Sequence, residues 1–157
     1  MAIEEKLKVA VVHQEPYYIG AFTDILETAG IDFDIYTSAS AALTGLKEKK
    51  YDLIITKLLY LGYAGLEELF PESDEYEESL RGGMAVIKQA HAEGSLNRTT
   101  PIWVIDVYRS GVSPIGQDKP LNVLAEEAGA ENYIHAAHSS GFLSALQKQF
   151  NLPALKK

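Results

Sequence analysis

The sequence predicts an α/β fold: a doubly wound parallel sheet of five strands in the order 2-1-3-4-5, with helices on both faces. Five short apolar runs alternate with segments of helical periodicity, and strict alternation of this kind forces parallel pairing through right-handed crossovers. The second run is amphipathic, which places it at an edge of the sheet. The 157 residues fit a single domain spanning 1–157, whose last residues, 151–157, are expected to form a frayed tail.

The first strand and helix are expected within residues 8–30. Residues 8–12 (KVAVV) are apolar and β-branched, which is typical of a strand buried on both faces. Pro16 suits the first turn of the following helix, and Gly30 suits its end. Between them an apolar stripe recurs every three or four residues, through Ile19, Phe22, Leu26 and Ala29.

The second strand alternates between apolar and polar side chains, which predicts one face toward the core and one toward water. The apolar set is Ile31, Phe33 and Ile35, and the polar set is Asp32, Asp34 and Tyr36. Ser38 or Ser40 can cap the next helix, which carries Leu43 and Leu46 and closes on lysines that complement a helix C-terminus.

The rest of the chain supplies three more strands and three more helices. We expect strands at residues 53–57, 101–107 and 132–134, and helices at 84–91, at 121–128 before Gly129, and from Ser139 or Ser140 to Phe150. Two connections are longer than a normal βα turn, at about 58–83 and 108–119, and loops of this length tend to be functional or disordered.

Charge and composition exclude several function classes. The formal net charge of -8 argues against nucleic acid and anionic membranes, because both are bound through concentrated lysine and arginine. The absence of cysteine removes disulfides, thiolate catalysis and sulfur-ligated metals. No run of about 20 apolar residues and no signal pattern is visible, so we expect a soluble, cytoplasmic protein.

Several segments together resemble response-regulator receiver domains. Five pieces in the family's order carry the resemblance: KVAVVHQEP, YDLIITKLL, GGMAVIKQ, PIWVIDVY and AEEAGAENYIHAA. The resemblance runs from about Lys8 to Phe150. It implies a flavodoxin-like fold and a role in bacterial-type two-component signalling.

Taken position by position, the chemistry of that family does not carry over. The aspartate that accepts the phosphoryl group matches Lys57, and a lysine cannot accept it. The acid pair that holds magnesium matches His13 and Gln14, leaving Glu15 as an acid nearby. The threonine or serine of the fourth strand matches Asp106, and the lysine after the fifth strand matches Ala136. The altered pocket therefore comprises His13, Gln14, Glu15, Lys57, Asp106, Tyr133 and Ala136.

The resemblance thus implies a pseudo-receiver: an interaction module that works without phosphorylation, with no catalytic residue, resident metal or cofactor. We hypothesise that Lys57 pairs with Asp106 or Glu15 and fills the place of metal and phosphate. The plainer alternative is that Lys57 reaches solvent at the end of its strand. Motifs for nucleotide or flavin loops, and the Gly-x-Ser-x-Gly elbow of hydrolases, are absent from the sequence.

Two surfaces are candidates for a protein partner. Residues 67–78 hold seven acids and no base, and the surrounding insertion offers Tyr60, Tyr63, Phe70 and Tyr76. That composition suits docking of a basic partner, and a solvated flexible loop explains it equally well. The second surface is the face of the fourth helix, fifth strand and fifth helix, where receivers commonly dimerise. It contains Tyr133, the aromatic position whose burial reports activation in that family.

A different function class stays open. A small enzyme or metal-binding protein could use the polar residues that end the strands, namely His13, Glu15, Lys57, Asp106, His135 and His138. No pair of them has the spacing of a metal-binding motif, so ordinary loop histidines are the simpler explanation. His91, on a helix face, is expected to be solvated.

Overall fold

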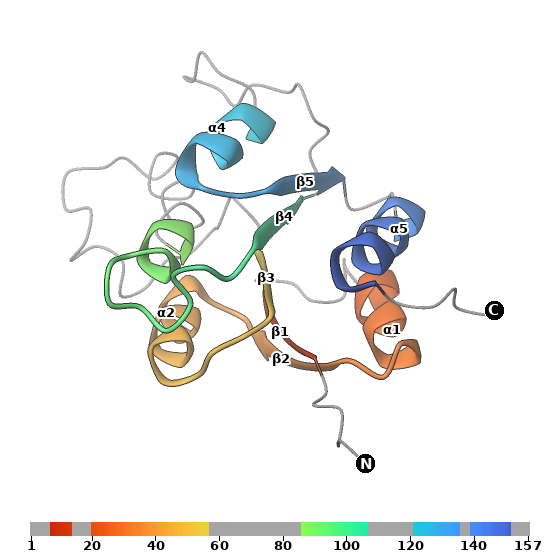
Figure 1. Cartoon of the computed structure of the whole chain (residues 1–157), viewed down its shortest axis with the longest axis horizontal. Helices are drawn as coiled ribbons and strands as arrows, with labels where there is room; N and C mark the ends of the chain where they lie inside the picture. The colour runs from red at the N-terminus through yellow and green to blue at the C-terminus, as the bar shows by residue number, and fades with distance from the viewer. Residues whose placement is uncertain (1–6, 14–19, 57–85, 107–120, 136–138, 152–157) are drawn as a thin grey trace.

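A five-stranded parallel sheet lies at the centre of the molecule (Figure 1). The computed structural model describes residues 7–13, 20–56, 86–106, 121–135 and 139–151. The strands are β1 (Lys8–Val12), β2 (Asp32–Tyr36), β3 (Leu53–Thr56), β4 (Ile102–Asp106) and β5 (Asn132–His135), in the order β2-β1-β3-β4-β5. The predicted strand order is therefore confirmed, with the amphipathic strand at an edge.

The register brings the carboxyl ends of the strands to one edge of the sheet. Val12 pairs with both Tyr36 and Thr56, and Asp106 pairs with His135. His13 continues the first ladder by one residue, since its backbone N–H donates to the carbonyl of Tyr36 at 2.9 Å. All pairings are parallel, so residues that follow different strands meet at this edge.

Helices cover both faces of the sheet, as the sequence predicted (Figure 1). On one face lie α1 (Gly20–Thr28) and α5 (Ser139–Phe150). On the other lie α2 (Ala39–Glu48), α4 (Leu121–Ala128) and a helical turn at residues 86–90. Among the described residues, no helix is both long and apolar enough to cross a membrane.

Each face of the sheet has its own apolar cluster. Under α1 and α5, the rings of Phe22 and Phe142 pack edge to face with centroids 4.9 Å apart, and Trp103 meets Phe142 at 6.0 Å. Under α2 and residues 86–90, Ile54 and Ile87 are fully buried. Burial of these apolar side chains away from water is the main favourable contribution to the free energy that holds the helices on the sheet.

The predicted helix ends are confirmed where the structure describes them. The Ser38 hydroxyl accepts a hydrogen bond from the Ala41 N–H at 3.0 Å, which caps α2. Gly129 follows α4 with a φ of 121°, and a Cβ there would lie 3.1 Å from Nδ1 of His91. Both the backbone conformation and the close approach of the imidazole therefore favour glycine at this position.

Three predictions about burial were wrong. Ile35 keeps 42% of its surface exposed, because it stands nearer the carboxyl edge than Phe33 and lies outside the cluster under α1. Tyr36, expected on the wet face, instead packs against the cluster under α2. His91 is only partly exposed, and its Nε2 lies 2.7 Å from the carbonyl oxygen of Thr100, so it is not a freely solvated histidine.

Candidate functional site

The carboxyl edge of the sheet is where open α/β folds bind ligands. The described strands reach it at His13, Thr56, Asp106 and His135. Two of these side chains are buried: His13 is 1% exposed and Thr56 is 0% exposed. For Asp106 and His135 the structure describes only the backbone, which pairs the two residues directly across β4 and β5.

His13 is the predicted pocket residue whose surroundings are best described. Its imidazole is buried next to the ends of β2 and β3, at the position where the resemblance expects a magnesium-binding acid. Magnesium prefers oxygen ligands in near-octahedral geometry, and an imidazole offers nitrogen. In the described part of the chain, no three histidine or acidic side chains come together to hold a metal ion.

Tyr133 is half-buried and packs against the cluster under α2 and α4. It borders a polar recess of about 440 Å³ between α4 and β5, whose other lining residues include Asn122, Glu126, Glu131 and Asn132. Because β5 is the last strand of the sheet, this recess lies beside an outer strand. The recess is acidic and belongs to the face predicted for dimerisation or partner contact.

The other predicted site residues lie outside the described residues. From the altered pocket these are Gln14, Glu15, Lys57 and Ala136, and from the acidic insertion they are Tyr60, Tyr63, Phe70 and Tyr76. The pairing of Lys57 with Asp106 or Glu15 therefore stays a prediction. His138, named for the alternative metal site, also lies outside.

A polar cluster around Asp34 was not predicted from the sequence. The Tyr51 hydroxyl donates to Oδ2 of Asp34 at 2.7 Å, and the Tyr36 and Tyr51 hydroxyl oxygens lie 2.6 Å apart. Since the Tyr51 proton goes to Asp34, Tyr36 is the donor in the second bond. Lys49 and Lys8 complete the cluster, with Nζ atoms 3.4 and 3.9 Å from the same carboxylate oxygen.

The cluster shifts the titration of two of its members. The hydrogen bond from Tyr51 holds the pKa of the Asp34 carboxyl below its usual value; partial burial opposes this, while Lys49 and Lys8 act in the same direction as Tyr51. Burial raises the pKa of the Tyr51 hydroxyl well above its usual value, and the hydrogen bonds with Tyr36 and Asp34 add to the rise. Tyr51 therefore remains a neutral donor and Asp34 a charged acceptor near neutral pH.

A second buried group, Asn97, ties two loops together at the opposite edge of the sheet. Its Oδ1 accepts from the Tyr51 N–H at 2.8 Å. Its Nδ2 donates to the carbonyls of Leu46 at 3.0 Å and Lys49 at 2.8 Å. The side chain is fully buried, and its amide contacts the end of α2 and the start of β3 at once. Neither this residue nor the Asp34 cluster leaves a local sequence pattern, because the partners are distant in sequence.

The similarities to known proteins are structural. Matching solved structures include a response regulator from Hahella chejuensis (20% identity, TM-score 0.60, 93% of each chain covered). The chemotaxis protein CheY4 of Vibrio cholerae matches at 16% identity and TM-score 0.63, over 93% of this chain and 100% of that one. No protein-family model and no curated protein matches the sequence.

A third match is the receiver domain of a sensor histidine kinase from Pseudomonas aeruginosa, with a magnesium ion coordinated in its active-site cleft. It shares 14% identity at TM-score 0.61, over 94% of this chain and 99% of that one. Identities this low establish the fold. The chain has the fold of receiver domains, and the resemblance predicted from its sequence is confirmed at that level.

Proposed function

We propose that this chain is a pseudo-receiver: a protein-protein interaction module in signal transduction that works without being phosphorylated. The observation that carries the proposal is the buried imidazole of His13 at the end of β1. A buried nitrogen base at this position does not provide the oxygen ligand that a hard divalent cation such as magnesium prefers. In the sequence, Lys57 follows directly after Thr56, the last residue of β3, and so adds a positive charge after the carboxyl end of β3.

The polarity of the edge supports the same proposal. A phosphorylatable pocket needs several carboxylates that a metal neutralises. Here the sequence supplies a histidine after β1, a lysine after β3 and two acids, Asp106 at the end of β4 and Glu15 two residues beyond His13. Such a set favours internal ion pairing over metal binding, so no catalytic role is assigned to it.

The proposed work of the module is recognition of a protein partner. The acidic insertion, with Tyr60, Tyr63, Phe70 and Tyr76, supplies the charge and aromatic groups that a basic partner would contact. The face of α4, β5 and α5 is proposed as the second contact, either with a partner or with another copy. The acidic recess beside Tyr133 supports this role, because its two glutamates complement basic side chains.

Phosphorylation chemistry is tested directly. The protein is incubated with magnesium and acetyl phosphate, and separately with magnesium and beryllofluoride, and its intact mass and magnesium affinity are measured. We expect no added phosphoryl group and no magnesium binding. The Pseudomonas aeruginosa receiver domain, processed in parallel, controls for magnesium binding. Stoichiometric labelling of an aspartate would refute the proposal.

The partner role needs its own experiment. The tagged chain is used to recover proteins from its native host, alongside a variant in which the seven acids of residues 67–78 are replaced by amides. We expect the variant to lose the partner. Asp24 and Glu27, both exposed on α1, provide the control for a general loss of negative charge when changed to amides. Equal recovery by the wild type and the acid-depleted variant would exclude the insertion as the contact.

A metal analysis of protein purified without a histidine tag separates this proposal from the metal-enzyme alternative. Stoichiometric zinc or iron would favour the alternative, in which His13, Asp106 and His135 act as ligands. Under our proposal no metal copurifies in stoichiometric amount.

A further inference from the structure

An apolar groove runs between α2 and the segment that follows the helical turn at residues 86–90. Its volume is about 240 Å³, and its floor and wall include Leu43, Leu46, Ala90 and Leu96. Leu96 keeps 49% of its surface exposed and is one of two large apolar side chains that the described residues expose. Leu46 and Ala90 are buried, so the apolar surface that the groove presents to solvent comes mainly from Leu43 and Leu96.

The positive charge of the described residues is concentrated around this groove. Residues 39–50 and 86–100 hold five cations (Lys47, Lys49, Lys50, Lys88 and Arg98) against two acids (Glu48 and Glu93). The other described residues hold two cations against nine acids. The groove is therefore a locally basic surface on an acidic protein.

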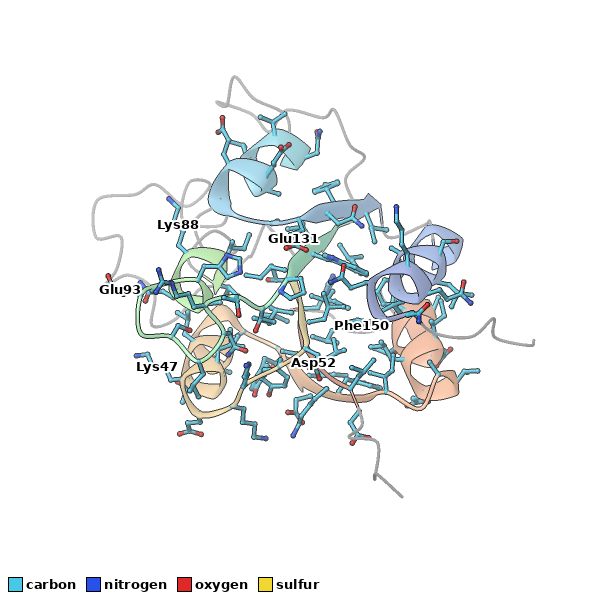
Figure 2. All side chains as sticks on the ribbon, in the orientation of Figure 1. Lys47, Asp52, Lys88, Glu93, Glu131 and Phe150 are labelled. Atoms are coloured by element: carbon cyan, nitrogen blue, oxygen red, sulfur yellow. The ribbon has the colours of Figure 1, made fainter. Side chains whose placement is uncertain are left out.

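The charged side chains lie at the groove itself. Lys47 and Glu93 are among the lining residues, and Figure 2 shows both on the same side of the molecule as Lys88. The hydrogen bonds of Asn97 to the carbonyls of Leu46 and Lys49 hold the loop that carries Leu96 and Arg98 against the end of α2. One of the five cations, Lys49, is partly neutralised by Asp34 at 3.4 Å; no ion pair is described for Lys47, Lys50, Lys88 or Arg98.

We propose that this groove docks an acidic amphipathic helix of a protein partner, with apolar side chains against Leu43 and Leu96 and acids facing Lys47 and Lys88. Apolar anchors in a groove flanked by complementary charge are the common features of helix-in-groove recognition. The surface lies on the α2 side of the sheet and does not depend on the state of the phosphorylation pocket.

The test uses the full chain and a synthetic helical peptide with leucines at every third and fourth position and glutamates elsewhere. A twin peptide carries lysines in place of the glutamates. Affinities are measured by fluorescence anisotropy. We expect the acidic peptide to bind. In the variant whose seven acids of residues 67–78 are amides, which removes the other proposed site for a basic partner, the basic twin should bind about tenfold more weakly than the acidic peptide or not at all, with the difference shrinking as salt is raised.

Variants assign the binding to the groove. We expect Leu96→Asp and Lys47→Glu each to lower the affinity for the acidic peptide about tenfold, which corresponds to about 1.4 kcal/mol of binding free energy. Ile35→Asp changes the other exposed large apolar residue, on β2, and Lys148→Glu reverses an exposed charge on α5. Both controls should leave the affinity unchanged. Equal binding of the two peptides, or no effect of Leu96→Asp, would overturn the proposal.

Two other occupants are distinguished by the same design. If the chain's own acidic residues filled the groove, replacing the seven acids of residues 67–78 by amides would strengthen binding of the acidic peptide. If a second copy filled it, sedimentation would show a dimer that Leu96→Asp dissociates. Either result would overturn the assignment to a separate partner. None of these outcomes bears on acetyl phosphate labelling, so this proposal and the pseudo-receiver proposal can fail independently.

Discussion

Tyr51 and Asp34 are joined across β1, the strand that separates them in the sheet. The Tyr51 hydroxyl, just before β3, donates to Oδ2 of Asp34 in β2 at 2.7 Å. Tyr51 is 2% exposed and belongs to the same apolar cluster as Ala10 and Val12 of β1, while its hydroxyl reaches the edge strand. This bond is a tie between the edge strand and the centre of the sheet, additional to the backbone ladder.

Removing the Tyr51 hydroxyl should therefore destabilise the fold. Tyr51→Phe leaves the ring and removes both hydrogen bonds, one of them to a charged acceptor, so we expect the free energy of unfolding to fall by about 1 to 3 kcal/mol. Tyr36→Phe removes only the bond between the two hydroxyls, and its cost should be smaller. Urea denaturation measures both. If Tyr36→Phe cost as much as Tyr51→Phe, the bond to Asp34 would contribute nothing.

Stability should depend on pH through Asp34. The hydrogen bond from Tyr51 and the nearby lysines depress its pKa in the folded state, so its contribution is present above the unfolded pKa of about 3.9 and is lost as pH falls through the folded value. We expect the difference in unfolding free energy between wild type and Asp34→Asn to be constant from neutral pH down to about pH 5 and to shrink below about pH 4. A difference that does not change with pH would show that the carboxylate charge is not involved.

Asn97 should be among the residues most sensitive to substitution. Asn97→Ala leaves the Tyr51 N–H and the carbonyls of Leu46 and Lys49 without their partner inside the protein, and each buried polar group left unsatisfied costs about 1 to 3 kcal/mol. We expect a total loss of about 3 kcal/mol in chemical denaturation. Thr99→Ala, two residues away and exposed, is the matched control and should have little effect. A loss no larger than that of the control would contradict the assignment.

Gly45 tests how tightly Tyr36 packs on α2. A Cβ at Gly45 would collide with the hydroxyl end of the Tyr36 ring, so Gly45→Ala must displace that ring and break its bond with Tyr51. We expect destabilisation, although alanine is intrinsically about 1 kcal/mol better than glycine inside a helix.

Two comparisons sharpen the Gly45 prediction. In a Tyr36→Ala background the same substitution should become stabilising, because the three heavy atoms nearest the added Cβ all belong to the Tyr36 ring and are removed. Gly141→Ala, in α5 with nothing within 4 Å of the added methyl, should stabilise the wild type. Thermal melts of the single and double variants measure the reversal of sign. Persistent destabilisation in the Tyr36→Ala background would place the cause elsewhere in the helix.

Lys57 tests the proposed ion pair directly. If Lys57 neutralises Asp106 or Glu15, then Lys57→Met leaves a carboxylate without its partner. The melting temperature should then fall by an amount that corresponds to about 3 kcal/mol of stability, and this loss should become smaller at low pH, where the carboxylate is protonated. Lys50→Met, at an exposed lysine, controls for the loss of charge. An unchanged melting temperature for Lys57→Met would support the alternative in which Lys57 reaches solvent.

The residue types of the candidate site were predicted from the sequence, whereas the burial of its side chains was learned from the structure. The resemblance to receiver domains, matched position by position, implied that histidine and lysine stand where that family has acids. Only the coordinates show that His13 is 1% exposed and that Asp106 of β4 pairs with His135 of the neighbouring strand β5. The acidic recess beside Tyr133 could not be predicted, because its walls come from α4 and β5 together.

By itself the sequence determined the alternation of strands and helices, the edge position of β2, the helix ends at Gly30 and Gly129 and a cap at Ser38 or Ser40, because each depends on neighbouring residues and on hydrophobic periodicity. Only the tertiary structure decided the exposure of Ile35, the packing of Tyr36 on Gly45 and the role of Asn97, whose partner Tyr51 lies 46 residues away. Local patterns record which face of a strand or helix is apolar. Which distant side chain completes a buried hydrogen bond depends on how α2, β2 and the loops are brought together, and that information appears only when the chain is folded.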